Sequence, residues 1–211
     1  MISTTKKEVA WVIIAILIMG FIISFSLSPN YSPKVLLISA IIILTSVITK
    51  KIAGPFYDIK VEHKVLEFKR WGVYVRSKFK SSVPMGLILP FFFSIISLGM
   101  IKPFTLLQSD YENLMKRRIR RRRGESDYRR VEENETDPAF TVAWGFLALI
   151  LLAIIATIIK QPELAKYSIY YGVWNLIPFG NLDGTKLFFG SLISWALITI
   201  IYIVSLIVVL V

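Results

Sequence analysis

The chain has no cysteine and only one histidine among its 211 residues. Without cysteine it can form no disulfide framework, thiolate metal site or cysteine nucleophile, although the compartment does not follow from that absence. Charged residues are also scarce, at 18%, against about 25% in soluble domains. No sequence resembles a phosphate-binding glycine loop, a serine hydrolase triad or an ion-selectivity filter. These absences exclude several common classes of enzyme and channel.

Apolar residues, in contrast, are abundant: 55% of the chain is hydrophobic and the mean hydropathy is +0.64. They are concentrated in long uncharged blocks rather than distributed with the period of an amphipathic helix or strand. A helix needs about 20 apolar residues to span a membrane. We therefore predict an α-helical, polytopic integral membrane protein. The five blocks are residues 9–27, 35–49, 81–101, 140–159 and 187–211.

We expect five to six transmembrane helices in a single membrane domain over residues 1–211. The short second block can span if flanking lysines extend their ammonium groups into the headgroups. A weaker stretch at 167–182, interrupted by Pro178 and Gly180, provides a broken crossing. The first block is too long for the core of a signal peptide and lacks a clean cleavage site, so we interpret it as a helix. The expected helices are approximately 9–28, 34–50, 140–160, 166–180 and 186–211.

The net charge of +11 comes mostly from two basic stretches, 50–80 and 116–130. Basic loops stay on the cytoplasmic side, which predicts a cytoplasmic N-terminus and cytoplasmic basic loops, including a loop at 104–138. If the third block spanned the membrane, the basic stretch 116–130 would lie on the outer side, against this rule. Because Pro84 and Pro90 interrupt that block, we predict that 81–103 is a re-entrant segment. The alternative is a kinked spanning helix.

Residues 57–80 alternate apolar and charged side chains around a turn at Trp71 and Gly72, which predicts a small β-hairpin or three-stranded meander on the membrane surface. The arginine run that follows is interpreted as a helix capped by Ser109 and Glu112. It either only sets topology or binds anionic lipid headgroups or a partner; nucleic acid is disfavoured because no aromatic stacking platform accompanies it. The basic residues are Lys116, Arg117, Arg118, Arg120, Arg121, Arg122 and Arg123.

The most specific local pattern lies in the sequence W-N-L-I-P-F-G-N-L-D-G that starts at Trp174. Proline and glycine break a helix there at membrane depth, and the freed backbone groups can bind a ligand or an extended peptide. An ionisable residue inside such a break, here Asp183, is a functional candidate. The candidate groove residues are Asn175, Pro178, Leu182, Asp183 and Gly184.

This segment resembles the N-x-x-P-x-x-x-L-D-G motif of the site-2 protease family of intramembrane zinc metalloproteases. The resemblance implies that Asp183 stands where the family has a zinc ligand. The wider order of helices, surface strands and re-entrant segment is also similar to that family. However, the family's second motif, H-E-x-x-H, which supplies two zinc ligands and the general base, is absent from this chain.

Two alignments can be drawn against the missing motif. One places Lys50, Lys51 and Gly54 at the His, Glu and His positions, and the other places Ile59, Lys60 and His63 there. Both lack the first histidine and the glutamate, whereas a catalytic zinc normally takes three protein ligands plus a water. We therefore expect no metal cofactor, no peptidase activity and a degenerate family member, a pseudoprotease.

Two residues have alternative interpretations. We expect His63, which lies among charged residues, to be an exposed surface histidine. Asp183 either caps the helix that begins near Thr185 or keeps a role in binding. The leading functional hypothesis is a catalytically inactive scaffold or adaptor that binds a transmembrane protein partner. The alternative is an active intramembrane zinc protease with atypical or partner-supplied ligands.

Overall fold

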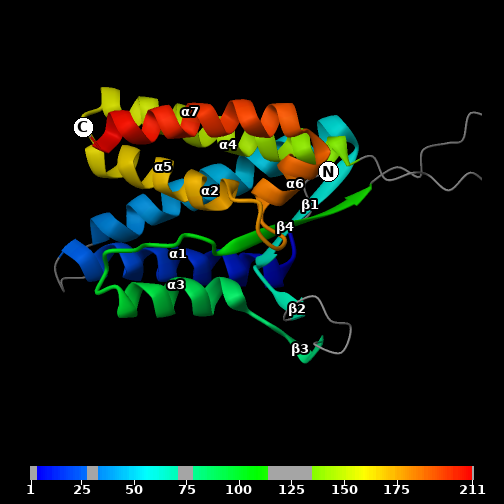
Figure 1. Ribbon diagram of the computed structural model, residues 1–211, viewed down its shortest axis with the longest axis horizontal. Helices are drawn as coiled ribbons and strands as arrows, with labels where there is room; N and C mark the ends of the chain where they lie inside the picture. Colours follow the sequence, from blue (N-terminus) through cyan, green and yellow to red (C-terminus); the bar gives the residue numbers. More distant parts are fainter. Residues whose placement is uncertain (1–3, 28–32, 71–77, 114–134, 211) are drawn as a thin grey trace, which may run out of the picture.

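The computed structural model describes residues 4–27, 33–70, 78–113 and 135–210, and helices dominate it (Figure 1). The helices are α1 (Lys6–Leu27), α2 (Pro33–Ala53), the short 3-10 helix η1 (Gly54–Tyr57), α3 (Met85–Ile96), α4 (Thr136–Ile158), α5 (Pro162–Leu176), α6 (Asp183–Gly190) and α7 (Leu192–Leu210). The strands are β1 (Ile59–Val65), β2 (Phe68–Arg70), β3 (Lys78–Val83) and β4 (Leu107–Asn113).

Four helical segments are long and apolar enough to cross a membrane. They are largely uncharged, and a helix satisfies its backbone hydrogen bonds internally, as a lipid environment requires. Many large apolar side chains on these helices are exposed, which a bilayer accommodates and water does not. The four segments are Lys6–Phe25, Pro33–Tyr57, Thr136–Ile158 and Leu192–Val209.

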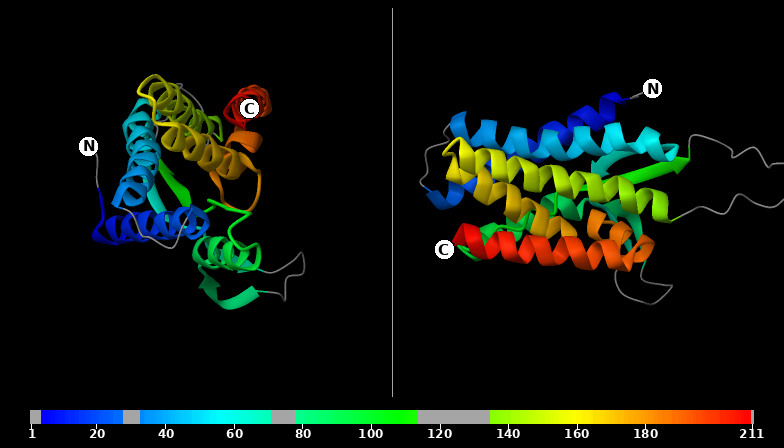
Figure 2. Two further views of the ribbon diagram at one scale, coloured as in Figure 1. Left: turned by 90° about the vertical axis from the view of Figure 1, so that its left-hand side faces the viewer. Right: turned by 90° about the horizontal axis from the view of Figure 1, so that it is seen from above.

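The C-terminal helices pack closely on α4. Tyr202 of α7 is fully buried, and its hydroxyl donates a hydrogen bond to the carbonyl of Phe146 at 2.9 Å. Its ring lies against Gly172 of α5, where an added Cβ would come within 2.2 Å of Tyr202. Only glycine leaves room for the ring at that point. The contact ties α7 to α4 and α5, whereas much of the rest of α7 lies at the edge of the molecule (Figure 2).

The segment between Gly86 and Leu106 leaves the strands and comes back to them. The Gly86 N–H donates to the carbonyl of Leu66 at 2.8 Å, and the Leu66 N–H donates to the carbonyl of Leu106 at 3.2 Å. Both ends of the segment are therefore attached to one residue. Figure 1 shows α3 running beside α1 and the chain then returning toward β4. Pro90 lies inside α3 without ending it, so the expectation that proline interrupts this block is wrong there; the helix loses one hydrogen bond and continues.

The strands form two antiparallel pairs, β1 with β4 and β2 with β3. In the first pair His63 stands opposite Ser109. Ser109 and Glu112 therefore belong to a strand, and the predicted helix cap at these residues is wrong. A local capping pattern cannot compete when a distant strand supplies hydrogen bonds along the whole segment. The expected loop at 104–138 consequently contains β4 and the start of α4.

The C-terminal region is more broken than the sequence predicts. The helix expected at 166–180 starts at Pro162 and ends at Leu176, because Ile177 before Pro178 is extended. The single helix expected at 186–211 is wrong: Ser191, with φ −159° and ψ 92°, separates α6 from α7. A Cβ at Gly190 would lie 2.3 Å from the carbonyl oxygen of Glu135. The end of α6 can therefore pack directly on the start of α4.

Candidate functional site

The acidic residue of the L-D-G segment forms a buried ion pair with a lysine of α2. The Lys50 ammonium lies 2.6 Å from Asp183 Oδ2 and donates a second hydrogen bond to Ser109 Oγ at 3.2 Å. The two charged side chains are only 3% and 8% exposed. A buried charge is tolerated when it is paired and hydrogen-bonded. Helices α2 and α6 and strand β4 thus meet at one polar centre.

Glycine makes this arrangement possible on two sides of the pair. The Lys50 stem passes over Gly145 of α4, where an added Cβ would lie 2.9 Å from Lys50 Cγ. On the other side, a Cβ at Gly184 would lie 2.1 Å from the carbonyl oxygen of Leu176. The glycine of L-D-G therefore lets the start of α6 sit against the end of α5, which fixes the position of Asp183.

Asp183 does not cap its own helix through its side chain. It is the first residue of α6, Leu182 occupies the cap position, and no side-chain cap hydrogen bond forms. The carboxylate instead points to Lys50, so the interpretation of Asp183 as a helix cap is wrong. Its second oxygen, Oδ1, is buried and has no hydrogen-bond partner among the described residues.

A second buried cluster, the Glu8 cluster, consists of Glu8, Lys51 and His63. The Lys51 ammonium lies 2.7 Å from Glu8 Oε2 and also donates to Thr4 Oγ1 at 3.0 Å. The other carboxylate oxygen, Oε1, accepts the His63 backbone N–H at 3.0 Å and lies 3.1 Å from His63 Nδ1. The cluster connects α1, α2 and β1, with both oxygens of Glu8 engaged.

His63 is fully buried, so the expectation of an exposed surface histidine is wrong. Alternation along β1 turns this side chain inward, and Glu8 supplies the polar partner that the local sequence did not reveal. Burial lowers the pKa of His63 below its ordinary value of 6.5, and the nearby positive charge of Lys50 lowers it further. The contact with Glu8 opposes this shift. The imidazole is therefore neutral at pH 7.

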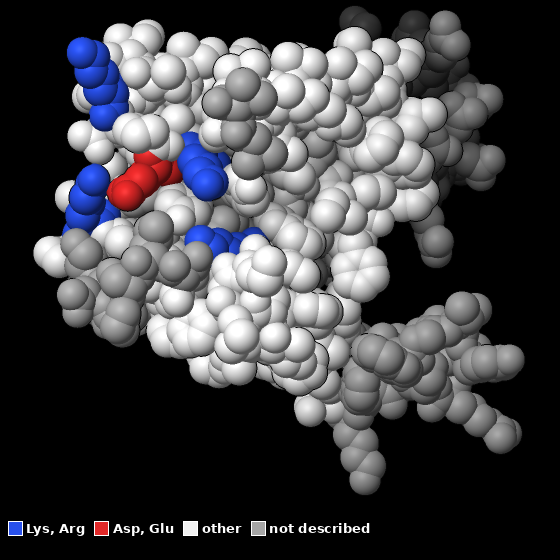
Figure 3. Space-filling model, turned by 60° about the vertical axis from the view of Figure 1, so that its left-hand side comes forward, with Lys and Arg blue, Asp and Glu red and all other residues white. Residues whose placement is uncertain are grey.

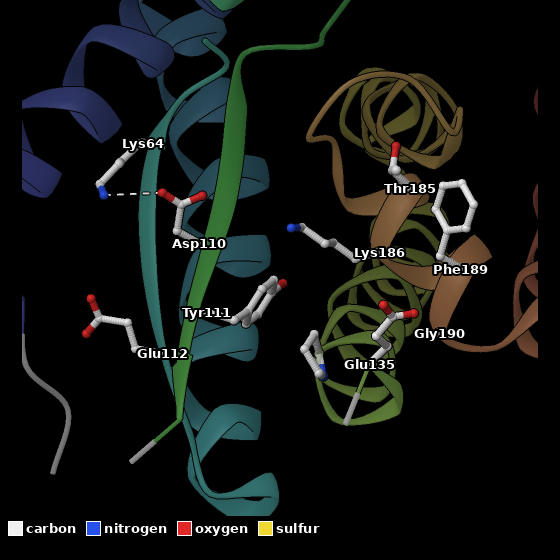
Figure 4. A pocket seen from close by; sticks show the side chains of 10 residues that line it. Lys64, Asp110, Tyr111, Glu112, Glu135, Thr185, Lys186, Phe189 and Gly190 are labelled. Carbon is white, nitrogen blue, oxygen red and sulfur yellow. Dashed lines mark hydrogen bonds and ion pairs between the residues drawn. The ribbon is translucent and has the colours of Figure 1, made fainter. Parts of the chain in front are cut away.

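A surface cleft of about 630 Å³ lies between β4 and α6, which we name the β4–α6 cleft. Lys186 extends from α6 toward β4, and the Tyr111 ring extends from β4 toward α6 (Figure 4). Lys64 is paired with Asp110 at 3.2 Å, and this carboxylate raises the pKa of Lys64. The cleft is lined by Lys64, Asp110, Tyr111, Glu112, Glu135, Pro138, Thr185, Lys186, Phe189 and Gly190.

Two hydroxyl groups on the residues lining this cleft are incompletely hydrogen-bonded within the described part of the chain. Thr185 Oγ1 has no partner, and Tyr111 Oη has only a contact with the Ser109 side chain; both oxygen atoms are buried. Burial raises the pKa of Tyr111 well above 10, and the negative charge of Asp183 contributes to the shift. Tyr111 therefore keeps its proton and can donate it in a hydrogen bond. These two residues of the cleft therefore keep hydrogen-bonding capacity that the chain itself does not fully use, whereas Asp183, two residues before Thr185, does not line the cleft.

The other residues of the expected groove have different positions. Asn175 is buried, and its amide donates to the carbonyls of Phe104 at 3.1 Å and Tyr171 at 2.8 Å. It thus holds the segment that returns from α3. Pro178 is exposed in the loop after α5, whereas Leu182 is fully buried. The structure brings Asp183 and Gly184 together with Lys50, but not with Pro178. The basic residues 116–123 lie outside the described residues.

The donors around Asp183 do not fit a zinc ion. Of the two alignments, the one that places Lys50 at the first histidine position puts that residue next to Asp183, and Lys50 is a cation. Lys51 is engaged with Glu8, and Gly54 has no side chain. In the described ranges, three or more His, Asp or Glu side chains do not converge anywhere. Zinc requires three or four such neutral or anionic ligands.

Sequence reasoning missed Glu8, Ser109, Tyr111 and Thr185. Glu8 carried a usable signal, because an acid at the start of an apolar helix predicts a buried partner. The strand residues carried none, since their place depends on the pairing of β1 with β4. A comparison with known protein families, curated proteins and solved structures gave no match.

Proposed function

We propose that this chain is a multi-pass membrane protein similar to the site-2 proteases but without a metal centre, and that it acts as a scaffold or adaptor. It binds an extended segment of a transmembrane partner in the β4–α6 cleft. One observation carries the proposal: the acid of the L-D-G segment is paired with Lys50, while Asp183 Oδ1 and Thr185 Oγ1 have no partner in the described chain and Tyr111 Oη has only a contact with Ser109.

Lys50 explains how such a site works without metal. Its ammonium provides a fixed positive charge at Asp183. A metal ion would also bind a water and lower its pKa to generate a nucleophile, which an ammonium does not do. The site can therefore hold a peptide through polar contacts but lacks the means to hydrolyse it.

Strand addition is the binding mode that we propose. β4 pairs with β1 on one side, and no other described strand pairs with it. The side of β4 that carries Tyr111 faces α6 across the cleft (Figure 4). An added strand lies about 4.8 Å from its neighbour and uses the backbone groups of the free edge. Lys186 would lie on the opposite side of such a strand and contribute charge selectivity.

The proposed topology places the N-terminus, the β4–α6 cleft and the basic stretch 116–123 on the cytoplasmic side, where the basic stretch meets anionic lipid headgroups. The segment at 81–103 is then re-entrant. Two observations support this: Gly86 and Leu106 both bind Leu66, and α3 has 12 residues. At 1.5 Å per residue such a helix is about 18 Å long, too short for a hydrocarbon core of about 30 Å.

Single cysteines test this topology, because the chain contains none of its own. We expect an impermeant maleimide added outside intact cells to label Gln161→Cys. Ser126→Cys should react only after the membrane is permeabilised. Labelling of Ser126→Cys from outside would contradict the re-entrant segment and leave the kinked spanning helix.

Photocrosslinking tests the binding function. A benzophenone amino acid at Phe189, which lines the cleft and is 70% exposed, should form an adduct with a transmembrane protein in native membranes. The same group at Phe92 on α3, which is 55% exposed, is the matched control. Mass spectrometry of the adduct should place the crosslink in an extended segment of the partner.

Removing the two cleft hydroxyls sharpens this test. Tyr111→Phe with Thr185→Val should lower the yield of the Phe189 adduct severalfold, yet leave thermal stability unchanged or raised, because incompletely paired buried groups cost free energy. Tyr202→Phe, which loses a hydrogen bond far from the cleft, should show the reverse pattern. Equal yields of adduct from Phe92 and Phe189 would contradict the proposal. A stoichiometric amount of bound zinc in the purified protein, lost in Asp183→Ala, would also contradict it.

A further inference from the structure

The end of the molecule opposite the β4–α6 cleft carries a second concentration of charge. Basic side chains gather there around an acidic one (Figure 3). The lysines come from the start of α2, the segment after α3, the end of α4 and the start of α5, and Glu163 is the acidic residue. Lys34 is paired with Glu163 at 3.3 Å, so this carboxylate is engaged. The remaining lysines at this end are Lys102, Lys160 and Lys166.

Lys102 and Lys166 differ from Lys160 in their surroundings. The Lys102 ammonium donates to the Tyr167 hydroxyl at 3.3 Å and lies 5.2 Å from the centre of that ring. Lys166 lies 6.0 Å from the centre of the Tyr170 ring. Two aromatic rings of α5 therefore position two ammonium groups, whereas no contact of this kind is seen for Lys160 in the described part of the chain.

Lys102 is half-buried, and within the residues described no carboxylate lies within ion-pair distance of it. Lys102 binds the hydroxyl of Tyr167, the residue after Lys166, so both cations lie at the same turn of α5. Burial lowers the pKa of Lys102, and the positive charge of Lys166 lowers it further. A cation that loses hydration without a counter-ion costs free energy, and a second cation adds to that cost. An anion between the two lysines would remove both costs.

We propose that Lys102 and Lys166, with the hydroxyl of Tyr167, bind the phosphate of an anionic lipid headgroup at the end of the molecule opposite the β4–α6 cleft. The helix α3 alone does not reach this end; the residues after it carry Lys102 to Tyr167. The surroundings favour lipid over a soluble phosphate. Leu98 and Met100, just before Lys102, are 80% and 89% exposed, so apolar side chains stand where acyl chains would pass. This site is independent of the function proposed for the cleft.

Native mass spectrometry of the purified protein with added phosphatidylglycerol or phosphatidylcholine tests this site. The double variant Lys102→Gln, Lys166→Gln should bind phosphatidylglycerol about 25-fold more weakly, from roughly fivefold for each cation near an anionic headgroup. Its binding of phosphatidylcholine should fall much less. Lys160→Gln, at the same end of the molecule, should bind phosphatidylglycerol like the unchanged protein.

Equal losses in Lys160→Gln and the double variant would overturn the proposal, because general surface charge would then account for binding. So would full competition by water-soluble glycerophosphoglycerol at the same concentration, which would assign the site to a soluble phosphate. If the double variant fails to fold, Lys166→Gln alone decides, since this side chain is exposed. The affinity of Lys166→Gln for phosphatidylglycerol should fall about fivefold, and an unchanged affinity would refute the site.

Discussion

Two adjacent lysines at the end of α2 form two buried ion pairs of different character. Lys51 pairs with Glu8, and both oxygens of that carboxylate are engaged, by Lys51 and by His63. Lys50 pairs with Asp183, whose second oxygen has no partner in the described structure. The two carboxylates therefore differ, although the Glu8 cluster also has one buried atom, His63 Nε2, without a partner in the described residues. A carboxylate oxygen that is left unpaired keeps capacity for a further hydrogen bond. In the function that we propose, the Glu8 cluster contributes stability and the Asp183 site contributes recognition.

The largest effect is expected from breaking the Glu8 cluster. Lys51→Met leaves a buried carboxylate without its cation, which should lower the free energy of unfolding by about 3–5 kcal/mol. Thermal unfolding in detergent measures the loss, and Lys7→Met, an exposed lysine on the same end of α1, should change stability by less than about 0.5 kcal/mol. Normal crosslinking from Phe189 in any folded fraction is expected, because the β4–α6 cleft is not involved.

Breaking the Lys50–Asp183 pair should lower the free energy of unfolding somewhat less than Lys51→Met does. Lys50→Met leaves Asp183 unpaired, but the amide groups at the start of α6 favour a negative charge there, so we expect about 3 kcal/mol. The double variant Lys50→Met, Asp183→Asn should recover much of that loss and still fail to bind the partner. A double variant that unfolds like Lys50→Met, or that crosslinks normally, would argue against a recognition role for the pair.

A smaller change that displaces Lys50 without removing its charge sharpens the comparison. Gly145→Ala places a Cβ about 2.9 Å from Lys50 Cγ, and such overpacking costs about 1–3 kcal/mol. In a Lys50→Ala variant the Cγ atom that the new Cβ would meet is absent, so Gly145→Ala should cause no further loss of stability. Additive losses in the two backgrounds would show that Gly145 acts elsewhere.

The smallest effect is a pH dependence of the Glu8 cluster. Because the pKa of His63 is lowered in the folded state, the unfolded chain binds more protons below pH 6.5. The stability contribution is therefore present above pH 6.5 and is lost as pH falls toward the folded pKa, by at most about 1.4 kcal/mol per pH unit. Melting temperatures between pH 8 and 5 should show a shallower slope in His63→Gln. An identical slope would assign the dependence to another group.

The two lysine sites also show how far local patterns reach. Asp183 was predicted as the main functional residue because an acid in a broken apolar helix is costly and needs a reason. Its partner was not predicted, since Lys50 and Asp183 are brought together by the packing of α2, α4 and α6, which includes the fit of Lys50 over Gly145. The same lack of a local signal led to the wrong prediction that His63 is exposed, although β1 buries it against Glu8.

The strands illustrate the second limit. Alternation predicted strand character at Ile59 and Val61, and β1 begins there. Its partner β4 carries a serine and a glutamate in a helix-capping pattern, and only pairing over a long sequence separation makes it a strand. The break at Ser191 had no proline to mark it. It follows from the close approach of Gly190 to the carbonyl of Glu135.

The sequence by itself determined the apolar helices and the break at Pro178, and it predicted that Asp183 needs a partner, because hydropathy, proline and a costly buried charge act locally. Only the tertiary structure decided which lysine meets which carboxylate and which of those carboxylates is left with an unused oxygen. Such pairings depend on how distant helices and strands pack, since a buried charge is stabilised by whichever partner the fold brings within hydrogen-bond distance.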